Sequence, residues 1–311
     1  MTSTRTFVEL TVGVDIVASH GSDLRIRGEI LLPSDTTPSF LLVCLPGGGM
    51  NRNYFDLPTP EGEATASFAN AMTAKGFAVA MLDPLGIGES SVPADPHDLT
   101  PEMQSRALAA AVEALLQRVR TGGITGLAAL PGIRGIGVGH SYGAALSIGI
   151  QARRRPYLGL ALFGFGVAPM PRFDRNSEHA VPDAALPVEE GRARLPQSVR
   201  AIFPKPYLDI EPTGGERAKI LLHANDRLLA TTAYSTMLPF LFQADAAAID
   251  VPIMLAFGDR DLHGLPHENV RYYPNSNDIT LLVLPETRHN HFTYTTRATL
   301  FERLARWTEI L

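Results

Sequence analysis

The sequence has little cysteine, and this scarcity limits both its cross-linking and its compartment. Its 311 residues include one cysteine, Cys44, which excludes an internal disulfide. Cys44 lies in the apolar run "SFLLVCLP", where we expect a buried strand residue. The near absence of cysteine favours a reducing compartment, and we predict a cytoplasmic location.

Long apolar runs and an excess of basic residues are missing as well. No stretch reaches about 18 uninterrupted apolar residues, so we expect no membrane span. The N-terminal segment lacks a basic region followed by an apolar run, so we expect no signal peptide. The formal charge of −5 leaves no basic surplus to neutralise phosphates, which argues against nucleic acid as a partner and favours a small-molecule ligand.

Short apolar runs are abundant, since 45% of the residues are hydrophobic and only 19% are charged. This composition allows a large core, in one domain with an insertion or in two domains. Residues 5–18 and 24–32 alternate apolar and polar side chains, which predicts two strands joined by the turn "SHGSD". From Ser39 onward, runs such as "FLLVCL" and "YLGLALFGF" alternate with helical stretches, which predicts an α/β fold with a parallel sheet covered on both faces. Helices are expected over 61–75, 101–120, 142–153, 265–273 and 293–311.

The alternation of strands and helices is interrupted between Val167 and Ile249. The first half of this stretch is rich in proline, and the second half, "GGERAKILLHANDRLLATTAYSTMLPFLFQ", has a helical pattern. The sheet pattern returns with "VPIMLAFGDRD". We therefore predict a core domain formed by residues 1–166 and 250–311, with a mainly helical cap inserted over residues 167–249.

The stretch "RGIGVGHSYGAALSIGIQ" places Ser141 between Gly139 and Gly143 in a G-x-S-x-G pattern. The pattern closes an apolar run and opens an alanine-rich helix, so the serine is expected at a strand-to-helix turn. Glycine on both sides lets the backbones approach closely, and the strained turn lifts the hydroxyl clear of the sheet at a helix N-terminus. Ser141 is therefore a candidate nucleophile.

A serine nucleophile needs a base and a carboxylate that orients the base. The buried strand in "VPIMLAFGDRD" ends in Asp259 and Asp261. The strand in "ITLLVLPETRHNHF" leads to His289 and His291. Because catalytic groups gather at the carboxyl ends of parallel strands, the order serine, aspartate, histidine predicts a triad, with either aspartate and either histidine as its members.

These features resemble the α/β-hydrolase superfamily from about residue 24 to the C-terminus, apart from the cap. Besides "GHSYG", the segment "LPGGGMN" at 45–51 is similar to the family's glycine-rich loop after the third strand. The segment "LDPLGIGESS" at 82–91 is similar to its D-x-x-G-x-G-x-S loop. The resemblance implies a mostly parallel, eight-stranded sheet with helices on both faces. It also implies that Asp261 is the acid, from G-x-x-D, and that His289 is the base, from P-x-x-x-H.

The resemblance further implies an oxyanion hole formed by the backbone N–H groups of Gly48 and Tyr142. Backbone donors aimed at the oxygen of an acyl-transfer intermediate stabilise its negative charge. The glycines at 47–49 leave room for that close approach. Pro46 departs from the family pattern, since many members carry histidine there.

Other polar residues near these motifs are not expected to be catalytic. His140 should pack under the turn, while Asp83 and Glu89 should be structural or line the mouth of the site. His179 and His223 have no cysteine or carboxylate at metal-ligand spacing, so we predict neither a metal nor a cofactor.

The expected reaction is hydrolysis through an acyl-enzyme on Ser141, with a carboxylic ester, thioester or lactone of a hydrophobic small molecule as the substrate. The alternatives are hydrolysis of a carbon–carbon bond in a β-diketone, a peptidase, and a member of the fold that binds a ligand without turnover. Epoxide hydrolases and haloalkane dehalogenases of this fold carry aspartate at the elbow, so Ser141 argues against both. The sequence does not decide between a monomer and a homodimer.

The cap sequence carries apolar and aromatic segments, among them "MLPFLF" at 237–242. An insertion after the sixth strand stands over the carboxyl ends of the sheet, where Ser141 is expected. We therefore predict that Met237, Phe240 and Phe242, together with Gly49, line an apolar substrate site and exclude water.

Overall fold

The computed structural model describes residues 4–13, 15–17, 23–167, 215–229, 231–232, 241–263 and 265–311. Met237, Phe240 and His179, together with most of the predicted cap, lie outside the described residues. The described part of the cap region holds two short helices, α6 (Glu216–Leu221) and α8 (Gln243–Ala247). The division into core and cap therefore stays a prediction.

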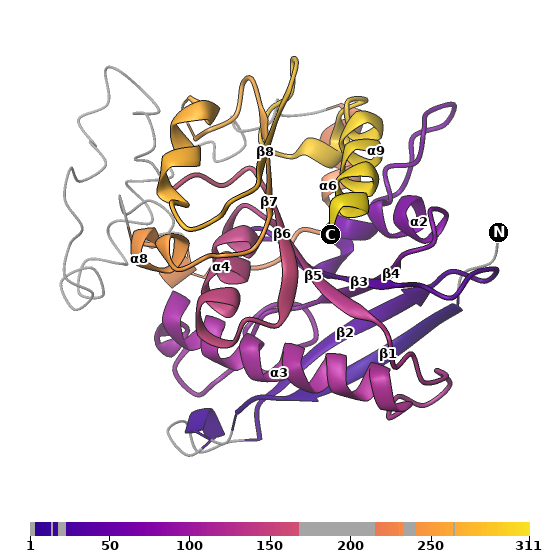
Figure 1. Cartoon of the computed structure of the whole chain (residues 1–311), viewed down its shortest axis with the longest axis vertical. Coiled ribbons are helices and arrows are strands. Elements are labelled where there is room, and N and C mark those ends of the chain that lie inside the picture. The colour runs from indigo at the N-terminus through magenta and orange to yellow at the C-terminus, as the bar shows by residue number, and fades with distance from the viewer. Residues whose placement is uncertain are drawn as a thin grey trace.

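One sheet of eight strands forms the centre of the fold (Figure 1). The strands are β1 (Thr4–Thr11), β2 (Arg25–Leu32), β3 (Phe40–Leu45), β4 (Ala78–Leu82), β5 (Arg134–His140), β6 (Tyr157–Phe163), β7 (Ile253–Gly258) and β8 (Ile279–Leu284). Their order across the sheet is β1-β2-β4-β3-β5-β6-β7-β8. β2 pairs antiparallel with both β1 and β4, and all other neighbours are parallel. The predicted fold class, a mostly parallel sheet of eight strands, is confirmed.

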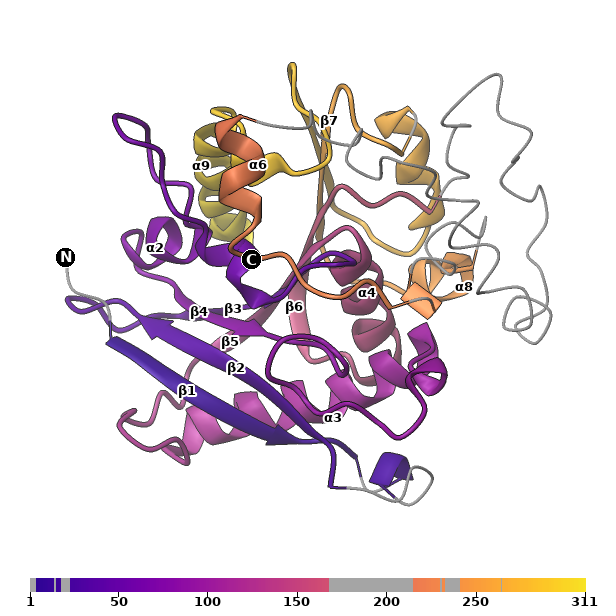
Figure 2. The same ribbon diagram turned by 180° about the vertical axis from the view of Figure 1, so that it is seen from behind.

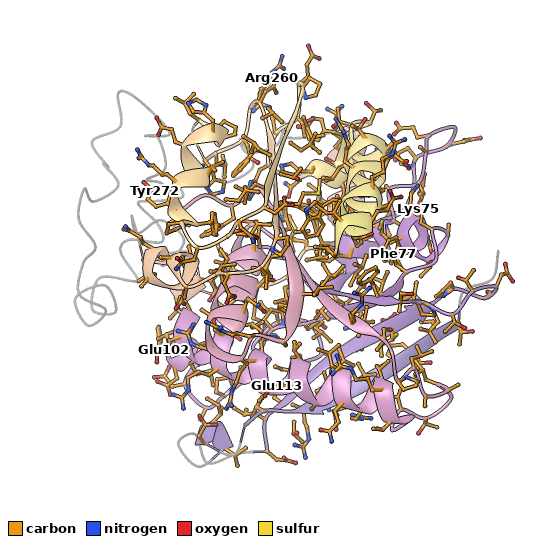
Figure 3. All side chains as sticks on the ribbon, viewed as in Figure 1. Lys75, Phe77, Glu102, Glu113, Arg260 and Tyr272 are labelled. Atoms are coloured by element: carbon orange, nitrogen blue, oxygen red, sulfur yellow. The ribbon has the colours of Figure 1, made fainter. Side chains whose placement is uncertain are left out.

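Helices cover both faces of this sheet (Figure 1 and Figure 2). On one face, α3 (Pro101–Thr121) packs against α4 (Tyr142–Arg154) over a core of mostly aliphatic side chains. On the other face, α2 (Phe68–Thr73) packs against α9 (Arg297–Trp307) over a core rich in phenylalanine. Side chains fill the space between sheet and helices, while Glu102 and Glu113 of α3 are exposed to solvent (Figure 3). None of the described helices combines the length and the apolar character needed to cross a membrane.

Two of the expected helices occur nearly as predicted, and the others differ at their boundaries. The helices expected over 101–120 and 142–153 are α3 and α4. The helix expected over 61–75 begins only at Phe68, because Ser67 caps it by accepting a hydrogen bond from the N–H of Asn70 (3.0 Å). The stretch expected at 293–311 divides into α9 and the 3₁₀ helix η6 (Thr308–Ile310).

Two further boundaries differ from the expected elements. The first strand ends at Thr11 instead of residue 18. The stretch expected as a helix over 265–273 is the 3₁₀ helix η4 (Pro266–Tyr272), which starts at a proline directly after Leu265.

The loops that carry the candidate site residues all leave the carboxyl ends of parallel strands. β3 leads to the glycines at 47–49, and β5 leads to Ser141. β7 leads to Asp261, and β8 leads to His289. Because β3, β5, β6, β7 and β8 follow one another across the sheet, these loops converge at one edge.

Candidate active site

Ser141 lies on a strained turn between β5 and α4. Its backbone angles are φ 53° and ψ −121°, a conformation that residues other than glycine rarely adopt. A Cβ at Gly139 would overlap the backbone of Ala144, and a Cβ at Gly143 would overlap the carbonyl oxygen of Leu45. The close approach of these backbones therefore explains why both flanking positions are glycine.

Ser141, His289 and Asp261 form a continuous chain of hydrogen-bonded side chains. The Nε2 atom of His289 lies 2.9 Å from Ser141 Oγ, and its Nδ1 atom lies 2.7 Å from Asp261 Oδ1. The N–H of Leu262 also donates to Asp261 Oδ1 (2.6 Å), which fixes the carboxylate from its own loop. This arrangement can move a proton from the serine hydroxyl to the imidazole while the carboxylate holds the ring in one tautomer.

The Asp261 carboxylate is buried but remains the charged partner of the chain. Burial by itself would raise the pKa of Asp261. The charges and hydrogen bonds of His289 and His291 outweigh burial and hold the pKa of Asp261 well below its usual range. The carboxylate is therefore ionised at neutral pH and can stabilise a positive charge on His289.

The other candidate acid, Asp259, and the other candidate base, His291, make different hydrogen bonds. Asp259 is exposed, and its Oδ1 atom accepts a hydrogen bond from the N–H of Thr287 (3.1 Å). His291 is buried, and its Nε2 atom lies 2.9 Å from Asp261 Oδ2, on the far side of the carboxylate from His289. The geometry favours Asp261 and His289 over these alternatives.

The glycine loop after β3 passes directly beside the nucleophile. A Cβ at Gly47 would lie 3.1 Å from the Cβ of Ser141. Gly49 has φ 78°, in the left-handed region that favours glycine. Among the described residues, no acceptor is bonded to the N–H group of Gly48 or of Tyr142.

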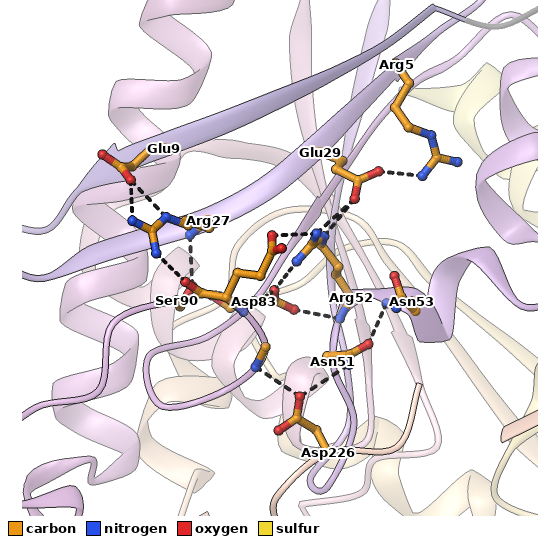
Figure 4. A network of polar contacts seen from close by, with 12 residues as sticks. Arg5, Glu9, Arg27, Glu29, Asn51, Arg52, Asn53, Asp83, Ser90 and Asp226 are labelled. Atoms are coloured by element: carbon orange, nitrogen blue, oxygen red, sulfur yellow. Dashed lines mark hydrogen bonds and ion pairs between the residues drawn. The ribbon is translucent and has the colours of Figure 1, made fainter. Parts of the chain in front are cut away.

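The chain that returns from the cap region is bonded to the same loop. Residues 224–226 and 49–51 are joined by an antiparallel bridge, with backbone hydrogen bonds of 2.9 and 2.8 Å. The Asp226 carboxylate also accepts from the side-chain amide of Asn51 (3.2 Å), as Figure 4 shows. It accepts from the N–H of Gly88 (3.0 Å) as well. These bonds connect the glycine loop to two other segments and limit its freedom to move.

A network of ion pairs surrounds Arg52, which follows the glycine loop in the sequence (Figure 4). The Arg52 guanidinium contacts Asp83, Glu29 (2.9 Å) and Glu89 (2.8 Å). Asp83 is fully buried, and burial raises its pKa against the opposing effect of Arg52. Asp83 and Glu89 therefore join the loops after β3 and β4, which is a structural role, one of the two roles expected of them.

His140 and His263 lie close to the three hydrogen-bonded side chains without joining them. The His140 ring stacks on Tyr54, with ring centroids 4.4 Å apart, and its Nε2 atom lies 2.8 Å from the carbonyl oxygen of His289. His263 is buried, with its ring centroid 5.6 Å from that of His289, and the sequence motifs did not single it out. Burial lowers the pKa of both rings, to about 4 for His263, so both are neutral near pH 7.

Asp261, His263 and His289 are also the described residues that could hold a metal ion, since their ligand atoms lie within 4.8 Å of one another. Zinc accepts two imidazoles and a carboxylate as ligands. However, Asp261 and His289 already use these atoms in hydrogen bonds with each other and with Ser141. His223 is exposed and lies outside this group.

The burial of His263 predicts a loss of stability in acid. The unfolded chain binds a proton at this side chain near pH 6.5, whereas the folded chain does so only near pH 4, so the free energy of unfolding should fall as the pH decreases through this window. Between pH 7.5 and 5, His263 should account for roughly 2 kcal/mol of that fall. In urea unfolding, the decrease in the free energy of unfolding between pH 7.5 and 5 should be smaller by this amount in His263→Leu than in the wild type. The variant His223→Gln, at an exposed position, should show the same decrease as the wild type. Equal losses in the wild type and His263→Leu would contradict this prediction.

Comparisons with known proteins agree with this geometry at the level of family and fold. A model of the alpha/beta hydrolase family matches residues 42–302. DcsB, solved in complex with its substrate analogue, is 14% identical with a TM-score of 0.64, and 97% of each chain is covered. A thermophilic esterase from Thermogutta terrifontis is 15% identical with a TM-score of 0.58, and 98% of each chain is covered. The epoxide hydrolase VrEH1 from Vigna radiata is 12% identical with a TM-score of 0.61 over 99% of this chain and 98% of that chain.

These solved structures share the fold, and at such low identity their different activities say nothing about the substrate of this chain. A search of curated protein sequences found no match. The family model, in contrast, spans the strands and loops that carry Ser141, Asp261 and His289 and covers well over half of the sequence. The chain therefore belongs to the alpha/beta hydrolase family.

Proposed function

We propose that the protein is a serine hydrolase that cleaves a carboxylic ester, thioester or lactone of a hydrophobic small molecule. The observation that carries this proposal is the chain of hydrogen bonds from Ser141 Oγ through His289 to Asp261, with distances of 2.9 and 2.7 Å. The strained turn at Ser141 supports it, because it presents the hydroxyl at the N-terminus of α4. The cytoplasmic location stays a prediction that rests on the near absence of cysteine.

In the proposed reaction, Ser141 Oγ attacks the carbonyl carbon of the substrate while His289 Nε2 takes the hydroxyl proton. The positive charge that forms on His289 is stabilised by the Asp261 carboxylate. His289 then gives the proton to the leaving group, and an acyl group remains on Ser141. A water molecule, activated by the same imidazole, releases the acid and restores the serine.

Negative charge develops on the carbonyl oxygen during both attacks, and the N–H groups of Gly48 and Tyr142 are proposed to receive it. Two features support this assignment. Both donors lack an acceptor within the described residues, and the loop of Gly48 passes beside Ser141. A backbone donor in such a position is worth about 3 to 4 kcal/mol of transition-state stabilisation.

The acyl site is proposed to be apolar and bordered by the segment that returns from the cap region. A Cβ at Gly48 would lie 3.0 Å from Thr232 Cγ2 and 3.3 Å from Leu228 Cδ1, so both side chains pack over the proposed oxyanion donor. Gly49, in the same loop, is partly exposed. We propose that it contacts the substrate, as the sequence predicts. Phe242 is buried in the hydrophobic core, with its ring 5.5 Å from that of Phe165, so a contact with substrate there requires the acyl group to reach deep into the site.

Leu228 should therefore set the length of acyl chain that the site accepts. Replacing Leu228 with phenylalanine should raise KM for p-nitrophenyl octanoate about tenfold and leave the KM for the acetate within about twofold, because a larger side chain fills the space beside Gly48. The matched control is Leu222→Phe, since Leu222 belongs to the same segment but is 68% exposed. Equal effects on both esters, or an equal effect of the control, would remove Leu228 from the acyl site.

A series of p-nitrophenyl esters and thioesters tests the proposed function itself. We expect turnover that rises from acetate to medium-chain acyl groups, because apolar burial of the chain contributes binding free energy. Turnover of a β-diketone with no turnover of esters would favour carbon–carbon hydrolysis, and cleavage of peptide amides alone would favour a peptidase. Ligand binding with no turnover of any of these would identify a binding protein of this fold.

A further inference from the structure

Each carboxylate oxygen of Asp261 lies within hydrogen-bond distance of a different histidine. Oδ1 is 2.7 Å from His289 Nδ1, and Oδ2 is 2.9 Å from His291 Nε2. The proposed reaction uses only the first of these bonds. We infer that His291 is a positioning residue, which holds the Asp261 carboxylate in the rotamer that His289 requires, and this inference rests on the proposed function.

Packing fixes the place of the second histidine. His291 begins the 3₁₀ helix η5 (His291–Thr293), and its N–H donates to the carbonyl of His289 (3.0 Å), so the base and the second histidine share one tight turn. The His291 side chain is fully buried, and the Asp261 side chain is 2% exposed. The His291 ring also lies against His140, with ring centroids 5.7 Å apart. A partner with so little freedom restricts the rotation of the carboxylate that it binds.

The surroundings also determine which ring nitrogen of His291 donates a hydrogen bond. Its Nε2 atom faces the Asp261 carboxylate, which can only accept, so this nitrogen carries the proton. Its Nδ1 atom is buried and has no hydrogen-bond partner in the described part of the chain. The bond from Nε2 to Asp261 is therefore the one side-chain hydrogen bond of His291 among the described residues.

Because His289 and His291 bind the same carboxylate, a change at His291 should affect His289. The titratable groups around Asp261 are His289 and His291, which bond to it, and His263 and His140, whose rings lie next to that of His289. Loss of the donor at Oδ2 would concentrate negative charge on the carboxylate and favour the protonated form of His289. The base would then become active only at higher pH, so the acid limb of the kcat/KM profile would move upward.

Two substitutions of nearly equal shape separate this role from a structural one. The amide nitrogen of His291→Gln can reach Asp261 as the imidazole Nε2 does, whereas His291→Met fills the same space without a donor. We expect His291→Met to move the acid limb of kcat/KM upward by about half to one pH unit, and kcat at neutral pH to fall three- to tenfold. His291→Gln should restore both. Leu300→Ala, which removes buried side chain from α9, should lower stability without moving the limb.

A second measurement distinguishes failure of this inference from failure of the proposed function. The proton shared by His289 and Asp261 should give a downfield ¹H resonance, and this signal should shift in His291→Met and return in His291→Gln, even if no ester is turned over. Absence of ester turnover in the wild type would count against the proposed function alone. An unmoved acid limb together with an unmoved resonance in a folded His291→Met variant would overturn the positioning role.

Discussion

Replacing Ser141 with alanine is expected to lower kcat for the best p-nitrophenyl ester by about 10⁴-fold or more, because the acyl-enzyme is proposed to form on the Ser141 hydroxyl. The double variant Ser141→Ala with His289→Ala should be no slower than the single variant. The two side chains act as a unit through their 2.9 Å hydrogen bond, so removing the second adds no further loss. Kinetics on a single ester, with single-turnover controls, measure both effects.

The fold should survive the Ser141→Ala change. The side chain is only partly buried, and its hydroxyl lies at the edge of the core beside His289. The free energy of unfolding should therefore change by less than about 1 kcal/mol. A folded Ser141→Ala variant that keeps more than a few per cent of the activity would rule out the serine mechanism.

Asparagine at position 261 is expected to lower kcat by about 10⁴-fold, the size of effect that follows when the acid of a Ser–His–Asp triad becomes an amide. The amide cannot stabilise the charged imidazole and favours the wrong tautomer of His289. Asp259→Asn is the matched control, since this carboxylate lies two residues away and accepts only from the backbone of Thr287 (3.1 Å) among the bonds described above. It should keep at least half of the wild-type kcat. A larger loss at Asp259 than at Asp261 would contradict the assignment of the acid.

The parts of the site that could be read from the sequence are those with a fixed local geometry. The turn at Ser141 needs glycine at 139 and 143, because any side chain there would overlap neighbouring backbone, and this requirement is visible as a sequence pattern. The order of the strands places the loops of Asp261 and His289 beside the same edge. From the residues alone, either aspartate and either histidine remained open, because residues two apart in a loop have no fixed direction.

Contacts between distant segments left no such signal. From the sequence, His291 was a candidate only for the base itself. Its contact with Asp261 depends on the turn at η5, which has no local sequence pattern. His263 follows Asp261 by two residues, and only the folded chain shows that it is buried beside His289. Arg52 likewise gave no signal, because its carboxylate partners lie 23 to 37 residues away.

Helix boundaries were also predicted correctly where their cause is local, and incorrectly where it is a contact with a more distant residue. Thr100 caps α3 by accepting from the N–H of Met103 (3.2 Å), and Gly122 ends it with φ 74°. Both signals are local, and the expected helix over 101–120 matches the observed one. The segment before Phe68 has helix-forming residues, but it is held as a loop by a bond from the N–H of Ala66 to Thr59 Oγ1 (3.0 Å), seven residues away. The expected start at residue 61 was therefore wrong.

The central claim is that Ser141 is an activated nucleophile, and covalent capture by a fluorophosphonate tests it most directly. Trypsin should release residues 135–153 as one peptide, because arginine occupies positions 134 and 153 with no lysine or arginine between them. We predict one phosphonyl adduct per chain, on this peptide and at Ser141, that is absent from Ser141→Ala and forms far more slowly in Asp261→Asn. An unmodified wild-type peptide, or an adduct that persists in Ser141→Ala, would contradict the account.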